Sequence, residues 1–303
     1  MTSFALYFAM RFSLKDQVKL VAWAFAIGAL LSIVFALAIP DIGIHRLDHP
    51  GAWKGIYDYK NTFGSMMVLS SLAFFLLPID KPIHRLYQWA GFGLSLILML
   101  LSTSKTSLVL SILLVLILSF YRNFRWRGKV SVIFLDIGIL ILGCVSLIVF
   151  GEWVTILSGL GKDPTLTGRT PMWGVALTQL QERPWLGFGR NAFWAGGSKY
   201  ALAAGQAVSQ NFIPPHAHNG FIDLALDVGL LGFSLFLISF AIAYFWALKQ
   251  AYAARNSEDI WPLAVLMFLA MNNITESYLL RLANIYWVLY ITIALSVNKR
   301  KRI

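Results

Sequence analysis

The chain has 303 residues and a formal net charge of +11, and 58% of its residues are hydrophobic while 13% are charged. A soluble domain is usually about 45–50% apolar and about 25% charged, so the composition excludes an ordinary soluble protein. We expect an all-α, polytopic integral membrane protein that forms a single membrane domain over residues 1–303 in the lipid bilayer. The basic residues are scattered and form no tract, so nucleic acid is not an expected partner.

Continuous apolar segments predict about eight transmembrane helices. Backbone groups in lipid must be hydrogen-bonded within the segment, so such runs are interpreted as helices. A full crossing takes about 20 residues, and several predicted spans are shorter than that, among them 63–79, 106–121 and 283–297. The predicted spans are residues 18–39, 63–79, 86–102, 106–121, 130–150, 224–248, 260–278 and 283–297.

The lysines and arginines of alternate connections predict the orientation. They occur in the N-terminal segment, around residues 81–85, in residues 121–130 and at the C-terminus. These segments share one side if the spans alternate, and the positive-inside rule makes that side cytoplasmic. We therefore expect both termini in the cytoplasm and a long external loop over residues 151–218.

Within this loop, the residues after Arg169 predict a short amphipathic helix. Thr170 is a suitable N-cap and Pro171 suits the first turn. The apolar positions that follow predict a helix over residues 171–182 that lies on the membrane. Arg169 would then stand at a helix N-terminus, where its guanidinium can bind a phosphate group.

The stretch before the span 224–248 contains titratable groups at a membrane boundary, where such groups usually carry function. His218 can accept a proton from a hydroxyl, or it can simply cap the helix. Asp223 and Asp227 can orient His218, bind a sugar hydroxyl or link two helices. His216 and His218 could be half of a metal site, but a catalytic zinc ion needs three protein ligands, and no third ligand is evident nearby.

The helix after His218 is expected to leave free backbone N–H groups at Asn219 and Gly220, which favour an anion. Lys60 comes just before a span, where it either snorkels or meets an anion. Lys105 stands in a tight turn predicted on the same side as His218. Glu276 belongs to a polar run in an otherwise apolar helix, and such residues face a bundle interior or a cavity.

Four motifs together resemble the O-antigen ligase and polysaccharide polymerase family, and within it the exopolysaccharide polymerases. The resemblance covers roughly residues 20–295. His218-Asn219, nine residues, Gly229, two residues and Gly232 is similar to the family signature. The other three motifs are Arg169 with Trp173, Trp53-Lys54-Gly55 followed by Lys60-Asn61, and Ser104-Lys105.

The resemblance implies a GT-C-like bundle and a metal-independent glycosyltransferase without a cofactor. Such enzymes act on the periplasmic side of the bacterial inner membrane. They transfer a glycan from a polyprenyl diphosphate to a glycan or lipid A-core acceptor. His218 would be the catalytic base, and Arg169, Lys60 and Lys105 would bind the diphosphate. Residues that support the base or contact the acceptor would be Asn219, Asp223, Glu276 and His216.

Two departures from the family and one other class stay open. Lys105 stands where many members have arginine. A lysine at this position lacks the bidentate fork of arginine. The chain has fewer predicted spans than members commonly have, so a truncated, inactive member is an alternative. A flippase or polysaccharide transporter would have broken helices around a polar site at the bilayer midplane. Polar residues gathered at one face favour chemistry, and the motifs are shared by polymerases and ligases.

Overall fold

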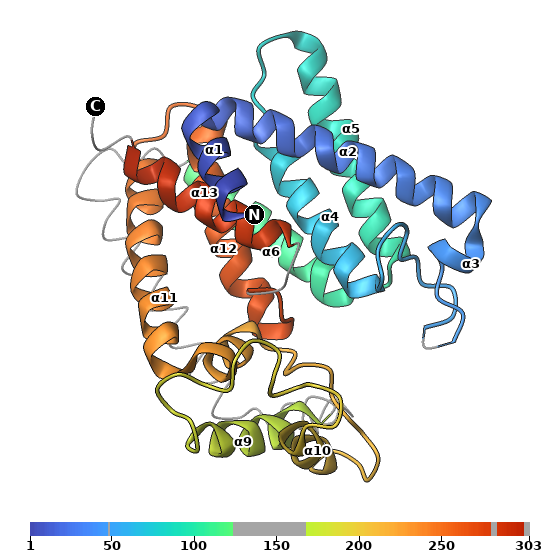
Figure 1. Ribbon diagram of the computed structural model, residues 1–303. Helices are drawn as coiled ribbons and strands as arrows, with labels where there is room; N and C mark the ends of the chain where they lie inside the picture. Colours follow the sequence, from blue (N-terminus) through green and yellow to red (C-terminus); the bar gives the residue numbers. More distant parts are fainter. Residues whose placement is uncertain (48, 124–167, 280–283, 300–303) are drawn as a thin grey trace. The chain divides into compact units, whose positions relative to one another are not determined.

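The computed structural model describes residues 1–47, 49–123, 168–279 and 284–299, and its regular elements in these ranges are helices (Figure 1). The all-α class is therefore confirmed. The chain divides into two compact units. Unit 1 comprises Met1–Arg125, Ser239–Asn272 and Ala283–Ile303, and unit 2 comprises Trp126–Ile238 and Asn273–Leu282.

Each predicted span that falls within the described residues contains a helix. These helices are α2 (Leu14–Ala38), α4 (Lys60–Phe75), α5 (Pro82–Leu101), α6 (Lys105–Asn123), α11 (Gly220–Tyr252), α12 (Trp261–Thr275) and α13 (Ile285–Lys299). The helices of spans 63–79 and 260–278 end early, at Phe75 and Thr275, so Glu276 lies just past a helix and not within it as predicted. The predicted span 130–150 lies outside the described residues. Shorter helices are α1 (Thr2–Arg11), α3 (Pro40–Gly43), α9 (Arg169–Leu180), α10 (Lys199–Gln206) and the 3₁₀ helix η1 (Ser257–Ile260).

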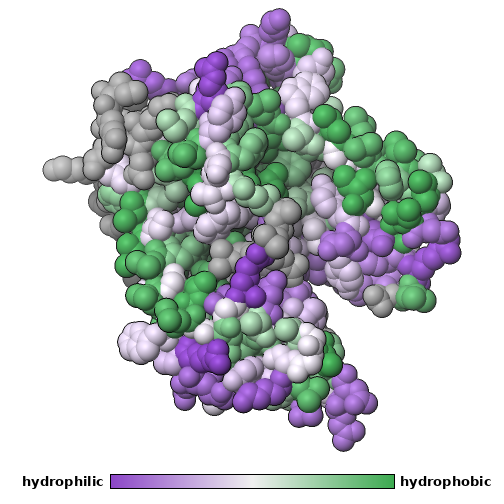
Figure 2. Space-filling view, in the orientation of Figure 1, coloured by the Kyte–Doolittle hydropathy of each residue, from purple (hydrophilic) through white to green (hydrophobic). Residues whose placement is uncertain are grey.

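By length and composition, α2 and α11 can each cross a membrane, and α6 and α13 contain shorter apolar segments, Lys105–Ser119 and Ile285–Val297. Figure 2 shows hydrophobic residues gathered over α11, at the left of the view. The full set of eight spans stays a prediction.

In unit 1, α4 is the central helix, and 12 of its 16 residues are buried. It packs against α2, α5 and α6 (Figure 1). Serine side chains connect α4 to its neighbours: the hydroxyls of Ser70 and Ser95 lie 2.8 Å apart, as do those of Ser71 and Ser111. Small polar residues of this kind hold apolar helices together where lipid removes the hydrophobic driving force.

In unit 2, α9 and α10 pack together (Figure 1). The side of α9 formed by Met172, Ala176 and Leu180 is buried in the hydrophobic core of the unit, which also contains Phe193, Trp194, Ala201, Ala204, Ala217, Ala225 and Leu226. This core accounts for the apolar face of the predicted helix 171–182. The position of that helix on the membrane stays a prediction.

The start of α9 differs from the expectation. Thr170 is not the N-cap, because the helix begins at Arg169 and Gly168 occupies the cap position with φ 82°. A Cβ atom on Gly168 would come within 2.4 Å of Val208. A left-handed glycine therefore turns the chain into α9 two residues earlier than a threonine cap would.

Helix α11 is broken at Gly229, whose φ and ψ are 68° and −178°. Residues 184–189, here called the closing loop, take up the backbone groups that the break frees. The N–H groups of Phe188 and Gly189 donate to the carbonyls of Leu226 and Asp227 at 2.8 and 3.1 Å. The loop's own carbonyls accept hydrogen bonds from the other side of the break, Leu230 N to Pro184 O at 2.7 Å and Leu231 N to Trp185 O at 3.2 Å.

Two glycines make this close approach possible. A Cβ atom on Gly229 would lie 2.3 Å from the Trp185 carbonyl oxygen, and a Cβ atom on Gly187 would lie 2.5 Å from the Leu226 carbonyl oxygen. Both glycines have positive φ. Since real Cβ atoms cannot approach backbone so closely, both positions require glycine.

We predict that Gly229→Ala lowers the unfolding temperature of the purified protein in detergent. Strained backbone costs about 1–3 kcal/mol, and the contact with the Trp185 carbonyl adds to it. Gly174→Ala in α9 is the matched control, because a Cβ there meets nothing within 4 Å. The control should be neutral or stabilising by up to about 1 kcal/mol. Equal unfolding temperatures for wild type and Gly229→Ala would contradict the account of the break.

Candidate functional site

Residues 216–218 form a turn that leads into α11, here called the histidine turn. The backbone of His218 is left-handed, with φ 52°. Its N–H donates to His216 Nδ1 at 3.1 Å, and the centroids of the two imidazole rings lie 4.1 Å apart. Because Nδ1 of His216 accepts, a neutral His216 carries its proton on Nε2. His216 can therefore donate a hydrogen bond from Nε2.

The buried residue Ala217, between the two histidines, is held on both sides. Its N–H donates to Asp223 Oδ1 at 3.0 Å, and its carbonyl accepts from Trp173 Nε1 at 2.7 Å. The same Asp223 oxygen accepts from Trp194 Nε1 at 2.7 Å. Two indoles and one carboxylate thus fix the histidine turn, and Trp173 comes from the helix that begins with Arg169.

The N-terminus of α11 is capped, contrary to the expectation of free N–H groups. Asn219 Oδ1 accepts from the N–H groups of Phe221 and Ile222 at 3.0 and 3.2 Å. The Gly220 N–H donates to the Glu276 carbonyl at 2.9 Å. Asn219 therefore acts as an N-cap, and the first donors of the helix are not available to an anion.

Three successive carbonyls at the C-terminal end of α12 accept hydrogen bonds from predicted site residues in distant parts of the chain. The Ile274 carbonyl accepts from Asn219 Nδ2 at 3.3 Å, and the Thr275 carbonyl accepts from Arg169 Nη1 at 3.1 Å. The next carbonyl, of Glu276, accepts from Gly220 as described. Arg169, Asn219 and the Glu276 backbone are thereby brought to one place. The Arg169 bond uses one of five guanidinium N–H donors.

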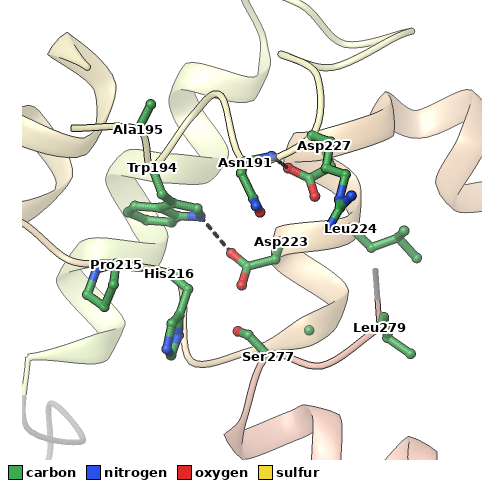
Figure 3. Close-up of a pocket in the computed structure, with 12 residues that line it drawn as sticks. Asn191, Trp194, Ala195, Pro215, His216, Asp223, Leu224, Asp227, Ser277 and Leu279 are labelled. Carbon is green, nitrogen blue, oxygen red and sulfur yellow. Dashed lines mark hydrogen bonds between the residues drawn. The ribbon is translucent and has the colours of Figure 1, made fainter. Parts of the chain in front are cut away.

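A pocket of about 600 Å³ lies beside the histidine turn in unit 2 (Figure 3). In the close-up, the Asp223 carboxylate points toward Trp194. His216 and Asp223 are the predicted site residues on its wall. The predicted residues His218, Arg169, Asn219 and Glu276 are not among its lining side chains, which include Arg190, Asn191, Trp194, Pro215, Leu224, Asp227 and Ser277.

Several of these wall residues were missed by the sequence analysis. From the sequence, Asp227 had several possible roles and was not placed in the site. In the structure its carboxylate accepts a hydrogen bond from the Asn191 N–H at 2.9 Å. Its spacing of four residues from Asp223 was the available signal, because it puts both carboxylates on one face of a helix. Asn191 and Trp194 lie in the long loop and have no comparable signal, since their carboxylate partners are 36 and 29 residues away.

Lys60 and Lys105 lie at one end of unit 1, as the first residues of α4 and α6. Burial lowers the pKa of Lys60, and the positive charge of Lys105 lowers it further. Lys60 Nζ lies 3.5 Å from Thr103 Oγ1, and its backbone N–H donates to His45 Nε2 at 3.1 Å. The two lysines therefore lie close enough for the charge of Lys105 to disfavour the charged form of Lys60.

Metal ligation is not supported by any cluster in the described ranges. No group of three His, Cys, Asp or Glu side chains there is arranged to hold a metal ion. The prediction of a metal-independent reaction is not tested by this finding, and it stays a prediction.

Trp173→Phe tests the clamp on the histidine turn. The change leaves the carbonyl of Ala217 without its indole donor, and a buried unsatisfied group costs about 1–3 kcal/mol. We expect a lower unfolding temperature of the purified protein in detergent. Trp89→Phe in α5 is the control, because that side chain is 56% exposed. If Trp173→Phe and Trp89→Phe change the unfolding temperature equally, the indole does not hold the turn.

Comparison with known proteins bears on the same residues. A sequence model of the family described as "O-Antigen ligase" matches residues 90–237. The matched range contains Lys105, Arg169, His218 and Gly229, whereas Lys60 precedes it. The resemblance drawn from the four motifs is therefore confirmed.

One curated relative also matches. The chain is 26% identical over 252 residues to "Exopolysaccharide production protein ExoQ" of Rhizobium meliloti (strain 1021). The match covers 80% of this chain and 56% of the relative, so the chain spans little more than half of that protein's length. Taken with the family match, it shows that this chain is similar to the O-antigen ligase family and to an exopolysaccharide production protein, as the motifs indicated.

Proposed function

We propose that this chain is a membrane glycosyltransferase of the bacterial inner membrane, with both termini in the cytoplasm. It transfers a glycan from a polyprenyl diphosphate to an acceptor hydroxyl on the periplasmic side. The reaction is that of an exopolysaccharide or O-antigen polymerase, or of an O-antigen ligase. Similarity to the family supports the class, and the name of the relative favours exopolysaccharide. The observation that carries the proposal is the fixed histidine turn beside a polar pocket.

The reaction needs one proton acceptor and one group to stabilise the leaving diphosphate. The acceptor oxygen attacks the anomeric carbon of the donor glycan, and the bond from that carbon to the diphosphate oxygen breaks. His218 takes the proton of the acceptor hydroxyl. The electron pair of the broken bond stays on the departing polyprenyl diphosphate. Positioning and charge stabilisation therefore supply most of the catalysis.

The resemblance assigns the diphosphate to Arg169, Lys60 and Lys105, and we keep this assignment. Arg169 has donors beyond its bond to Thr275 and can form a bidentate pair with a phosphate. The lowered pKa of Lys60 means that its charged form is disfavoured by burial and by Lys105. A bound anion would offset both effects and raise that pKa.

We assign the acceptor glycan to the pocket, whose wall residue His216 has its ring centroid 4.1 Å from that of the proposed base His218. The carboxylates of Asp223 and Asp227 can accept hydrogen bonds from sugar hydroxyls. The side-chain amide of Asn191 can accept one and can also donate one. The Nε2–H of His216 adds a donor on the same wall. Two carboxylates repel a diphosphate, so they favour the acceptor over the leaving group at this position. Asp223 also holds the turn, and thus serves both tasks.

A transporter or flippase is the second candidate, because α11 is broken at Gly229. In transporters the carbonyls freed by such a break coordinate the substrate or ions. Here the carbonyls of Leu226 and Asp227 accept hydrogen bonds from the closing loop. The break is therefore occupied by protein, which favours a transferase.

In cells that depend on this chain for polymer or ligated glycan, His218→Ala should abolish the product at an unchanged protein level. Arg169→Lys should lose most of it as well, because lysine keeps the charge but not the bidentate fork. The measurement is glycan analysis together with immunoblotting of the membrane fraction.

His84→Ala in α5 is the matched histidine control, and it should leave the product intact. Full product from His218→Ala would remove the proposed base. Full product from Arg169→Lys would remove Arg169 from the diphosphate site. Loss of product in the His84→Ala control would show that the assay reports folding rather than chemistry.

A further inference from the structure

The closing loop carries two of the most exposed large apolar side chains in unit 2. Trp185 is 70% exposed and Leu186 is 73% exposed. They are adjacent, and each lies within three residues of Pro184 and Phe188, where the loop is hydrogen-bonded to α11. Exposed apolar groups of this size on a fixed piece of backbone mark an interaction surface.

The backbone under these side chains is already satisfied. The Gly187 N–H donates to the Arg183 carbonyl at 3.0 Å, and the Pro184 and Trp185 carbonyls accept from Leu230 and Leu231. Irregular backbone is tolerated at membrane depth only where its polar groups are paired within the protein. The closing loop meets this condition at the groups named here.

The same contacts fix the loop beside the apolar part of α11. Leu230 and Leu231 are 43% and 53% exposed, and Leu235, one turn further along, is 61% exposed. This is the helix that can cross a membrane by length and composition, and Figure 2 shows hydrophobic residues over it. Backbone hydrogen bonds therefore hold the closing loop against α11, and the exposed apolar side chains of the loop lie next to those of the helix.

We infer that Trp185 and Leu186 insert into the lipid bilayer where the apolar part of α11 enters it. The partner is the interfacial layer of the membrane, because a tryptophan has a large apolar body with one polar edge and prefers that layer. Arg183, exposed and with its guanidinium carbon 5.7 Å from the centroid of the Phe188 ring, is placed to meet lipid phosphates.

The insertion would also set the depth of the pocket. The closing loop is bonded to the carbonyls of Leu226 and Asp227, and Asp227 lines the pocket. A loop anchored in the interface therefore holds the pocket at the level where the head of a membrane lipid lies. The inference about insertion does not depend on the proposed reaction.

The experiment uses the full chain in vesicles of phosphatidylethanolamine and phosphatidylglycerol. The natural cysteine is removed by Cys144→Ser, and a nitroxide label is attached at Leu186→Cys. Electron paramagnetic resonance then compares collision of the label with oxygen, which concentrates in lipid, and with a water-soluble nickel chelate. Leu235→Cys in α11 is the lipid reference, and Gln206→Cys at the end of α10 is the water reference.

The label at residue 186 should collide with oxygen more than with the chelate, as the label at residue 235 does. Collision dominated by the chelate, as at residue 206, would overturn the inference. If Leu186→Cys does not yield folded protein, Trp185→Cys carries the same expectation and the same contrary outcome. Because no glycan transfer is measured, a failure here is distinct from a failure of the proposed reaction.

Discussion

The position of the candidate site depends on the two backbone hydrogen bonds of one residue, Ala217. Its N–H is bonded to Asp223 in α11, and its carbonyl is bonded to Trp173 in α9. The two histidines flank this residue, so neither can move without breaking one of these bonds. The clamp thus joins two motifs that are far apart in the sequence. Trp173 therefore has a structural role of its own in the Arg169 motif, because its indole holds the Ala217 carbonyl. Phosphate binding by Arg169 alone would not need this tryptophan.

A second constraint is the break in α11, which explains the spacing of the family signature. His218 ends the histidine turn, Asn219 caps the helix, and Gly229 allows the break. The interval between them is the length of helix that carries Asp223 and Asp227. The closing loop is hydrogen-bonded at this break, and the segment that follows it carries Asn191 and Trp194, which donate to the two carboxylates. One signature therefore encodes the turn, the cap and the wall of the pocket.

Sequence alone predicted the helices well, because long apolar runs in lipid have one satisfactory backbone structure. It also placed His216 and Asp223 together, since they are close in the chain. It failed where distant residues decide: Asn219 and the Glu276 carbonyl take up the N–H groups expected to be free, and Gly168 replaces Thr170 at the start of α9. Trp194 and Asn191 contact their carboxylate partners only in the folded chain, so no local sequence pattern predicts that they belong to the site.

We propose that the histidine turn serves glycan transfer from a polyprenyl diphosphate. The most direct test is the purified chain in vesicles, supplied with a lipid-linked glycan and an acceptor. The measurement is the amount of free polyprenyl diphosphate relative to newly joined glycan. The account predicts one diphosphate released for each glycan transferred. Movement of intact lipid-linked glycan across the bilayer, with no diphosphate released, would contradict it.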